Sequence, residues 1–143
     1  MLAAPFRAHV EHTIAEAHVP WPAFAVASNL PVPAVHTLLF GRGGRALRRL
    51  EPGVATRILK VGPADLTLLR ISQVTADLAA ARLRALLRSG VPADRVARWC
   101  DLSTEQMLAL ADGRVSICSR LTEALAVAAE RMMFAPALGR RAA

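Results

Sequence analysis

The sequence predicts an all-helical fold made of two copies of one small helical unit. Ala, Leu and Arg dominate this chain of 143 residues, 54% of which are hydrophobic, and these residue types favour helices. Runs of β-branched residues are short, so helices alone are expected. The second half of the chain also repeats the apolar spacing of the first half. A chain of this length forms one domain, or two very small ones that share a core.

The repeat relates a segment that begins at Val19 to a segment that begins at Val91. Paired positions differ by 72 in residue number, and no gap is needed through Arg42 and Arg114. The identical pairs are Val19 with Val91, Pro20 with Pro92, Ala25 with Ala97, Leu30 with Leu102, Leu38 with Leu110, Gly41 with Gly113 and Arg42 with Arg114. Self-similarity at a fixed offset indicates a duplicated structural unit.

Each copy is predicted to contain two short helices joined by a tight turn. A small residue lies where the helices would cross (Ala25, Ala97), and a turn residue follows four positions later (Asn29, Asp101). Apolar residues ten and thirteen positions after the small residue form the inner stripe of the second helix, which a glycine ends. This spacing is typical of a helix-turn-helix. A bundle of duplicated helical hairpins without a nucleic-acid role is the alternative.

The repeat predicts tandem three-helix modules within a compact helical bundle. The first module covers residues 1–63 and the second covers residues 64–134, each with a covering helix at about residues 5–18 or 75–89. The boundary is marked by the sequence Gly-Pro-Ala-Asp at residues 62–65. Residues 135–143 are expected to form a flexible basic tail.

The charge of the chain favours a polyanionic partner. The formal net charge is +7, with 18 basic against 11 acidic residues, and Lys60 is the only basic residue besides His that is not Arg. Neutralising phosphates releases counterions, so a basic surface favours nucleic acid. A GC-rich genome, whose codons enrich Arg and Ala, is the alternative source of this charge.

Enzymes and metalloproteins are not expected, because no carboxylate pair, nucleophile–base arrangement or phosphate-binding loop occurs. Cys100 and Cys118 lack metal-ligand spacing and a neighbouring His, so buried thiols in a reducing cytosol are predicted, with no metal or cofactor. Residues 19–41 lack Asp, Glu, Lys and Arg, as a membrane span would. Their four prolines would leave backbone groups unpaired in lipid. We therefore expect a cytoplasmic, nucleoid-associated protein without a membrane partner or a small-molecule substrate.

Features around the first copy follow one another in a fixed order. Trp21 precedes the first motif helix, Gly41-Arg42 follows the second, and a closing helix carries Pro52, Ala55, Ile58 and Leu59. With these features the chain, from about residue 15 to 133, resembles a family of helix-turn-helix DNA-binding proteins common in actinobacteria and their phages. The segment "ARLRALLRSGVPADRVARWCDLSTEQMLALADGR" is similar to the second motif that such proteins often carry. The resemblance implies a DNA-binding regulator, sometimes encoded by a phage or mobile element.

The leading hypothesis is therefore a transcriptional regulator that binds double-stranded DNA with the second helix of the first motif in the major groove. The candidate contact residues are Val32, Pro33, Ala34, His36 and Thr37 on that helix, Arg42, Arg45, Arg48 and Arg49 after it, and Thr104, Gln106 and Arg114 in the second module. The four arginines are expected to reach phosphates or the minor groove, with an ordinary solvated loop as the alternative.

The composition of the two recognition helices supports a rival hypothesis. Neither contains an Arg to pair with guanine or an Asn to pair with adenine, and only Gln106 could read adenine. Glu105 and Asp112 would repel phosphates in the second module. Trp21 and Trp99 are expected to be packing residues rather than to stack on bases. The rival is a protein-interaction adaptor of helix-turn-helix fold that binds itself or another protein.

Overall fold

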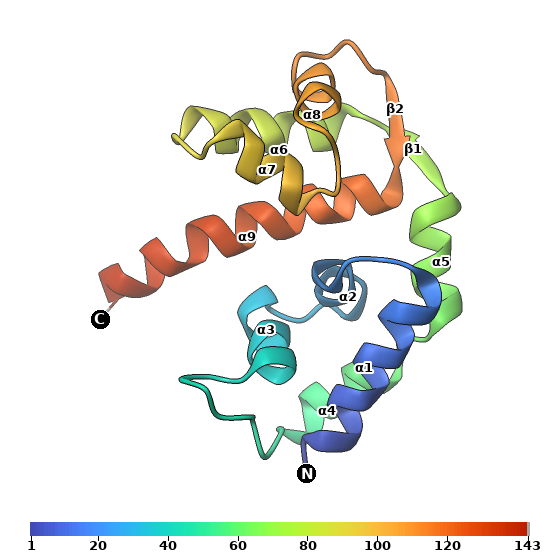
Figure 1. Cartoon of the computed structure of the whole chain (residues 1–143), viewed down its shortest axis with the longest axis vertical. Helices are drawn as coiled ribbons and strands as arrows, with labels where there is room; N and C mark the ends of the chain where they lie inside the picture. Colours follow the sequence, from blue (N-terminus) through green and yellow to red (C-terminus); the bar gives the residue numbers. More distant parts are fainter. Residues whose placement is uncertain (143) are drawn as a thin grey trace. The chain divides into compact units, whose positions relative to one another are not determined.

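The computed structural model describes the backbone of residues 1–142 and the side chains of residues 1–133. Within this range the chain is mostly helical, as the composition predicts. The chain divides into two compact units, Met1–Arg70 and Ile71–Ala143 (Figure 1). The boundary expected after residue 63 falls at the start of a helix, Pro63–Ile71. All but the last residue of this helix belongs to the first unit.

The first unit consists of helices only, apart from isolated bridges. In chain order they are α1 (Ala4–Ala17), α2 (Trp21–Ser28), α3 (Val32–Phe40), α4 (Pro52–Leu59) and α5 (Pro63–Ile71), whose last residue begins the second unit. Prolines open α2, α3 and α4 in the first turn, where the missing N–H leaves no bond unmade. Helix α1 packs against α2, α3 and α4. The core between them contains Phe24, Val35, Leu38 and Ile58, all fully buried.

The second unit has the same order of helices with a short sheet added. Its elements are β1 (Gln73–Thr75), α6 (Asp77–Arg88), α7 (Ala93–Trp99), α8 (Thr104–Ala111), β2 (Ile117–Ser119) and α9 (Arg120–Ala142). Helix α6 packs against α7, α8 and α9, and its Leu83 and Leu86 are fully buried. The indole Nε1 of Trp99 donates a hydrogen bond of 3.1 Å to the Leu125 carbonyl, which joins α7 to α9.

The duplicated helix pairs have the same turn. Asn29 and Asp101 adopt left-handed backbone conformations, with φ of 55° and 56°. After each turn the leucine amide donates to the alanine carbonyl, from Leu30 to Ala25 and from Leu102 to Ala97, at 2.9 Å in both cases. The sequence repeat between residues 19–42 and 91–114 is therefore also a repeat of backbone geometry.

The structural repeat extends beyond the sequence match. The alanine before the first helix of each unit, Ala3 or Ala76, is buried. Its amide donates to a carbonyl in the segment before the unit's fourth helix, from Ala3 to Arg48 at 2.8 Å and from Ala76 to Ser116 at 2.9 Å. Each unit is thus closed by antiparallel pairing between the chain that enters its first helix and the chain that enters its fourth helix.

This pairing corrects the expectation of helices only. In the second unit it forms a two-stranded antiparallel sheet, with Val74 opposite Cys118. In the first unit it is reduced to a bridge between Leu2 and Arg49. The strands pair because connectors extended beside each other satisfy one another's backbone groups. Three residues are too few to show the alternation by which a strand is recognised in sequence.

The last helix, α9, reaches into the segment where a flexible basic tail is expected. The backbone is helical to Ala142, and the side chains of the expected tail at residues 135–143 lie outside the described residues. Many residues of α9 are alanine, which has the highest helix propensity. Ala143 lies outside the described residues.

Replacing Ala25 or Ala97 by leucine is expected to destabilise the protein by about 1–3 kcal/mol, because added volume in a packed core forces neighbours apart. The two alanines are 0% and 2% exposed in their helix pairs. Thermal melts of Ala25→Leu and Ala97→Leu test this, with Ala27→Leu on the exposed side of α2 as the control. Equal melting midpoints for all three variants and the parent would contradict close packing at these positions.

Candidate nucleic-acid interface

The segment after α3 forms a tight hairpin built by three glycines. Arg42 and Arg45 exchange both backbone hydrogen bonds, at 2.9 and 3.1 Å. The residues between them, Gly43 and Gly44, have φ of 60° and 77°. Two central residues with positive φ define a type I′ turn, which matches the twist of a two-residue hairpin. The sequence analysis predicts only a loop here, but a Gly-Gly pair between two residues is a known sequence signal for such a hairpin.

Gly41 makes the sharp exit from α3 possible. Its φ of 75° and ψ of −171° lie in a region that is essentially restricted to glycine. A Cβ atom there would collide with the carbonyl group of Arg45. The hairpin therefore folds back directly on the end of the helix, which fixes its direction relative to α3.

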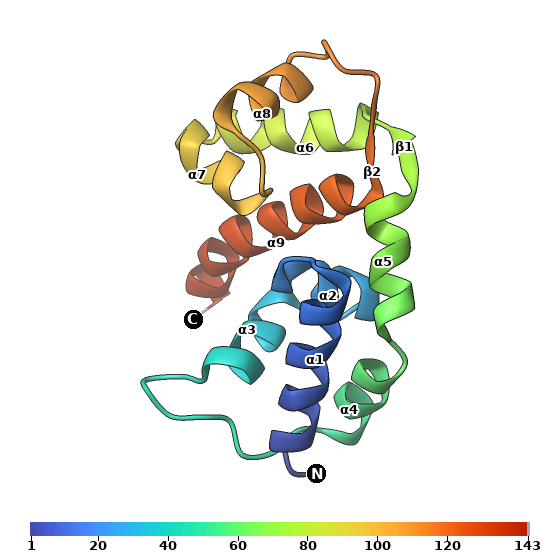
Figure 2. The same ribbon diagram turned by 45° about the vertical axis from the view of Figure 1, so that its right-hand side comes forward.

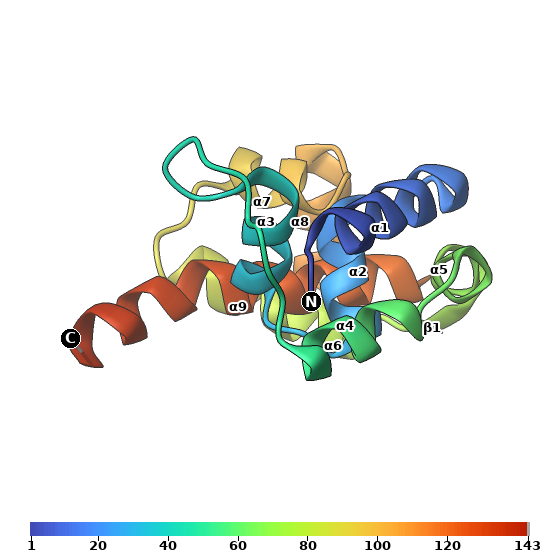
Figure 3. The same cartoon turned by 90° about the horizontal axis from the view of Figure 1, so that it is seen from below.

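Both ends of the hairpin loop are held by the body of the first unit. Arg7 of α1 donates from Nε to the Leu38 carbonyl at 2.8 Å and from Nη2 to the Leu47 carbonyl at 2.7 Å. Beyond Leu47, the Arg48 carbonyl accepts from the Ala3 amide, and the Leu50 amide donates to the Met1 carbonyl at 2.8 Å. Between these anchors the loop projects from the first unit in all three views (Figures 1, 2 and 3).

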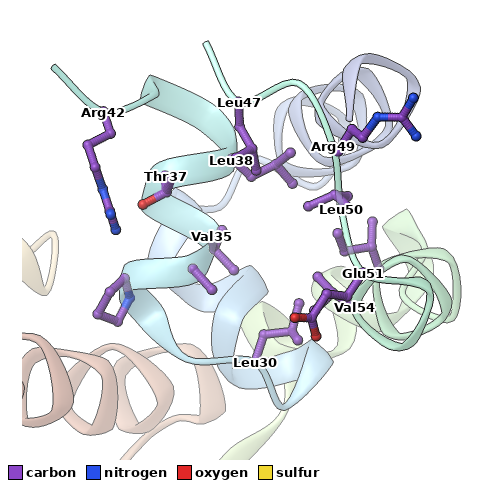
Figure 4. A pocket seen from close by; sticks show the side chains of 13 residues that line it. Leu30, Val35, Thr37, Leu38, Arg42, Leu47, Arg49, Leu50, Glu51 and Val54 are labelled. Carbon is purple, nitrogen blue, oxygen red and sulfur yellow. The ribbon is translucent and has the colours of Figure 1, made fainter. Parts of the chain in front are cut away.

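The hairpin (residues 41–45) and the segment that follows it (residues 46–50, called its second arm below) carry arginines without acidic partners. Arg42, Arg45, Arg48 and Arg49 are exposed, and residues 41–50 contain no Asp or Glu. Among the described side chains, none of these arginines forms an ion pair. Arg42 and Arg45 stand directly opposite each other, and such residues share one face of a hairpin. Figure 4 shows Arg49 on the other side of the nearby cavity from Arg42, so the four do not form a single cluster.

The structure corrects one candidate residue on α3 and supports the accessibility of others. Val32 is 0% exposed and belongs to the core, because the first turn of α3 is packed against the rest of the unit. Pro33 is exposed, whereas Ala34 and Thr37 are half-buried. Pro33, Ala34 and Thr37 of α3 are therefore accessible to a ligand, whereas Val32 is not.

His36 lies in an aromatic cluster that the sequence analysis did not anticipate. Its ring centroid is 5.5 Å from that of Trp21 and 5.0 Å from that of Phe40, and the Trp21 and Phe40 centroids are 5.8 Å apart. Phe40 is 59% exposed. The four-residue spacing of His36 and Phe40 on one helix could have indicated their contact, but the approach of Trp21 from α2 depends on the turn.

An open cavity of about 390 Å³ lies between α3, the hairpin's second arm and α4 (Figure 4). Pro33, Ala34 and Thr37 line one side, and Leu50 and Val54 line the other. A cavity of about 310 Å³ occupies the related place in the second unit, where Leu102 and Ala109 face Cys118 and Thr122. In the first unit α4 therefore leaves one side of α3 partly uncovered, and in the second unit α9 does the same to α8.

The candidate residues of the second unit are largely engaged within it. The Oε1 atom of Gln106 accepts from the Ser103 amide at 3.0 Å, and the Ser103 hydroxyl accepts from the Gln106 amide at 3.1 Å. This capping box holds Gln106 at the start of its own helix. Arg114 pairs with Asp112 at 3.3 Å. Thr104 is exposed.

The thiols of Cys100 and Cys118 are free, the first buried and the second half-buried. Burial raises the pKa of the Cys100 thiol to about 12. Burial and then the negative charge of Glu123 raise the pKa of Cys118. Both thiols therefore stay protonated near neutral pH. Among the described residues, no three His, Cys, Asp or Glu side chains are placed to hold a metal ion, and no helix is long and apolar enough to cross a membrane.

Comparisons of the chain with protein-family models, curated proteins and solved structures found no match. The interpretation of this surface therefore depends on its own geometry and charge.

Replacing Gly41 by alanine is expected to destabilise the first unit by about 1–3 kcal/mol, because an L-residue is strained in this conformation. Gly53→Ala is the matched control, since open space surrounds Gly53 and its φ is not in the left-handed region. Denaturant unfolding compares the two variants with the parent. Equal stabilities for the two variants would show that the hairpin does not fold back on α3 as described.

Proposed function

We propose that the protein is a DNA-binding regulator of transcription whose first unit docks on duplex DNA. In this proposal α2 and α3 act as a helix-turn-helix, with α3 in the major groove. Arg42, Arg45, Arg48 and Arg49, which follow α3, contact the DNA beside it. The support is the left-handed turn between two short helices, followed at once by a projecting basic hairpin.

The exposed arginines without acidic partners are the observation that carries this proposal. The charge of an arginine beside a carboxylate is partly neutralised, so that arginine releases fewer counterions when it approaches DNA. Arg42, Arg45, Arg48 and Arg49 have no such pair among the described side chains, so their full charge can displace counterions from the duplex. Because Arg7 and the N-terminal segment anchor the loop, less conformational entropy is lost when it binds.

The surface of α3 favours weak sequence discrimination in the major groove. Pro33, Ala34 and Thr37 offer no bidentate hydrogen-bond pair for guanine or adenine. Alanine and the threonine methyl group can instead contact the methyl group of thymine. Affinity would then come chiefly from phosphates, and base preference would be modest.

The second unit is proposed to contribute less to DNA affinity. Arg98 and Arg114 pair with Asp94 and Asp112, at 3.2 and 3.3 Å. Glu105 is exposed on α8, the helix that corresponds to α3, and its charge would oppose the approach of phosphates. Gln106 is also occupied by its capping box.

A protein-interaction adaptor is the second candidate function. The observation that favours it is the aromatic cluster of Trp21, His36 and Phe40, whose outer member is largely exposed on α3. Exposed aromatic residues are enriched in protein interfaces. Sedimentation of the parent and of Phe40→Ala separates the candidates. An oligomer that dissociates in the variant, together with absence of DNA binding at low salt, would favour the adaptor.

Removing the four arginines that follow α3 is expected to flatten the salt dependence of DNA binding. The slope of log affinity against log salt should fall by about two to four units when Arg42, Arg45, Arg48 and Arg49 are all changed to alanine, since each phosphate contact contributes nearly one unit. Fluorescence anisotropy with a labelled random duplex at several salt concentrations measures this slope.

A control variant removes the same amount of charge from the second unit. Arg88, Arg95, Arg98 and Arg114 are exposed, and their combined change to alanine should lower the slope by less. A larger loss in the control variant would assign the DNA contact to the second unit. Absence of salt-dependent binding by the parent protein would exclude this mode of DNA binding altogether.

A further inference from the structure

We infer that the hairpin at residues 41–45 enters the minor groove and gives the protein a preference for A·T-rich duplexes. This inference rests on the proposed DNA binding and adds to it a groove and a base composition. Its basis is the shape of the hairpin, the facing positions of Arg42 and Arg45, and the place of the hairpin after α3.

The hairpin tip is narrow enough to suit the minor groove. Gly43 and Gly44 form the whole tip, and neither carries a side chain. Apart from its immediate chain neighbours, no residue of the protein has an atom within 4 Å of a Cβ position built on either glycine, so the tip stands clear of the rest of the first unit. The minor groove of B-DNA is about 6 Å wide, which admits a bare chain more readily than a helix.

The two arginines at the base of the turn supply the charge that the minor groove attracts. Arg42 and Arg45 face each other across the hydrogen-bonded pair and therefore extend on the same face of the hairpin. Narrow minor grooves of A·T tracts have enhanced negative potential and attract inserted arginine. Guanine adds its N2 amino group to the floor of this groove, where it would obstruct the hairpin.

The connection to α3 places the hairpin next to the groove adjoining that helix. Gly41 allows no intervening spacer, since its amide still bonds to the Thr37 carbonyl at 2.8 Å at the end of α3. When a helix lies in the major groove, a chain that leaves its end must cross a phosphate backbone to reach the neighbouring minor groove. Arg48 and Arg49, farther along the loop, are suited to contact that backbone rather than the groove floor.

Replacement of guanine by inosine tests the inference directly. Inosine lacks the N2 amino group in the minor groove but keeps the O6 and N7 acceptors of the major groove. The parent protein should bind an I·C duplex about fivefold or more tighter than the G·C duplex of the same order of bases. An A·T duplex, which also offers the thymine methyl group in the major groove, should bind at least as tightly as the I·C duplex. Anisotropy at one fixed salt concentration measures all three affinities.

Two double variants of equal charge identify the residues responsible. Arg42→Ala with Arg45→Ala should bring the ratio of I·C to G·C affinity close to one. Arg48→Ala with Arg49→Ala should weaken binding to both duplexes and leave the ratio unchanged. Circular dichroism confirms that both variants keep the helical content of the parent.

Each remaining outcome contradicts a specific part of the argument. Salt-dependent binding by the parent with equal affinity for the I·C and G·C duplexes overturns the inference and leaves the proposed DNA binding standing. A ratio that survives the loss of Arg42 and Arg45, or that falls equally in both double variants, overturns the role of the hairpin. Absence of binding to every duplex overturns the proposed function and the inference with it.

Discussion

The left-handed turn between α2 and α3 is the constraint on which the rest of the first unit depends. A left-handed residue costs most L-amino acids about 1–2 kcal/mol, and asparagine bears this cost better than most. The turn is held from both sides, by the bond from the Leu30 amide to Ala25 and by Arg57, whose Nη1 donates to the Asn29 carbonyl at 3.0 Å. Because the turn sets the angle between the helices, it fixes which side of α3 is buried and the direction in which α3 runs.

The position of the hairpin follows from the end of α3. Gly41 turns the chain back on the helix, and the bonds from Arg7 tie the helix end and the returning strand to α1. A guanidinium beside carbonyl groups at a helix C-terminus also interacts favourably with the helix dipole. One half-buried arginine, bonded to two carbonyl groups, thus helps to position exposed arginines several residues away. The arginine that holds this surface in place, Arg7, is therefore not itself proposed to contact DNA.

The features predictable from sequence were those with a local or periodic cause. The turn at Asn29 and the glycine at the end of α3 follow from residue types that suit left-handed backbone, and the repeat located both again in the second half. The burial of Val32 was missed, because position within a first turn does not reveal which side faces the core. The three-residue strands were missed because they form only when the fold brings distant chain segments together. The pairing of Arg114 with Asp112 was missed because it depends on side-chain orientation.

The two units show how one backbone frame can carry different surfaces. The positions that set the frame are alike, with small buried residues at Ala25 and Ala97 and left-handed residues four positions later. The connection after the helix pair contributes no residue to the buried core in either unit. In the first unit its residues 41–50 are glycine-rich and contain four arginines but no acidic residue, whereas in the second unit the shorter connection contains one arginine, Arg114, which pairs with Asp112. Core packing does not determine the charge of an exposed connection. We therefore attribute the different charges of the two connections to what each one contacts outside the protein.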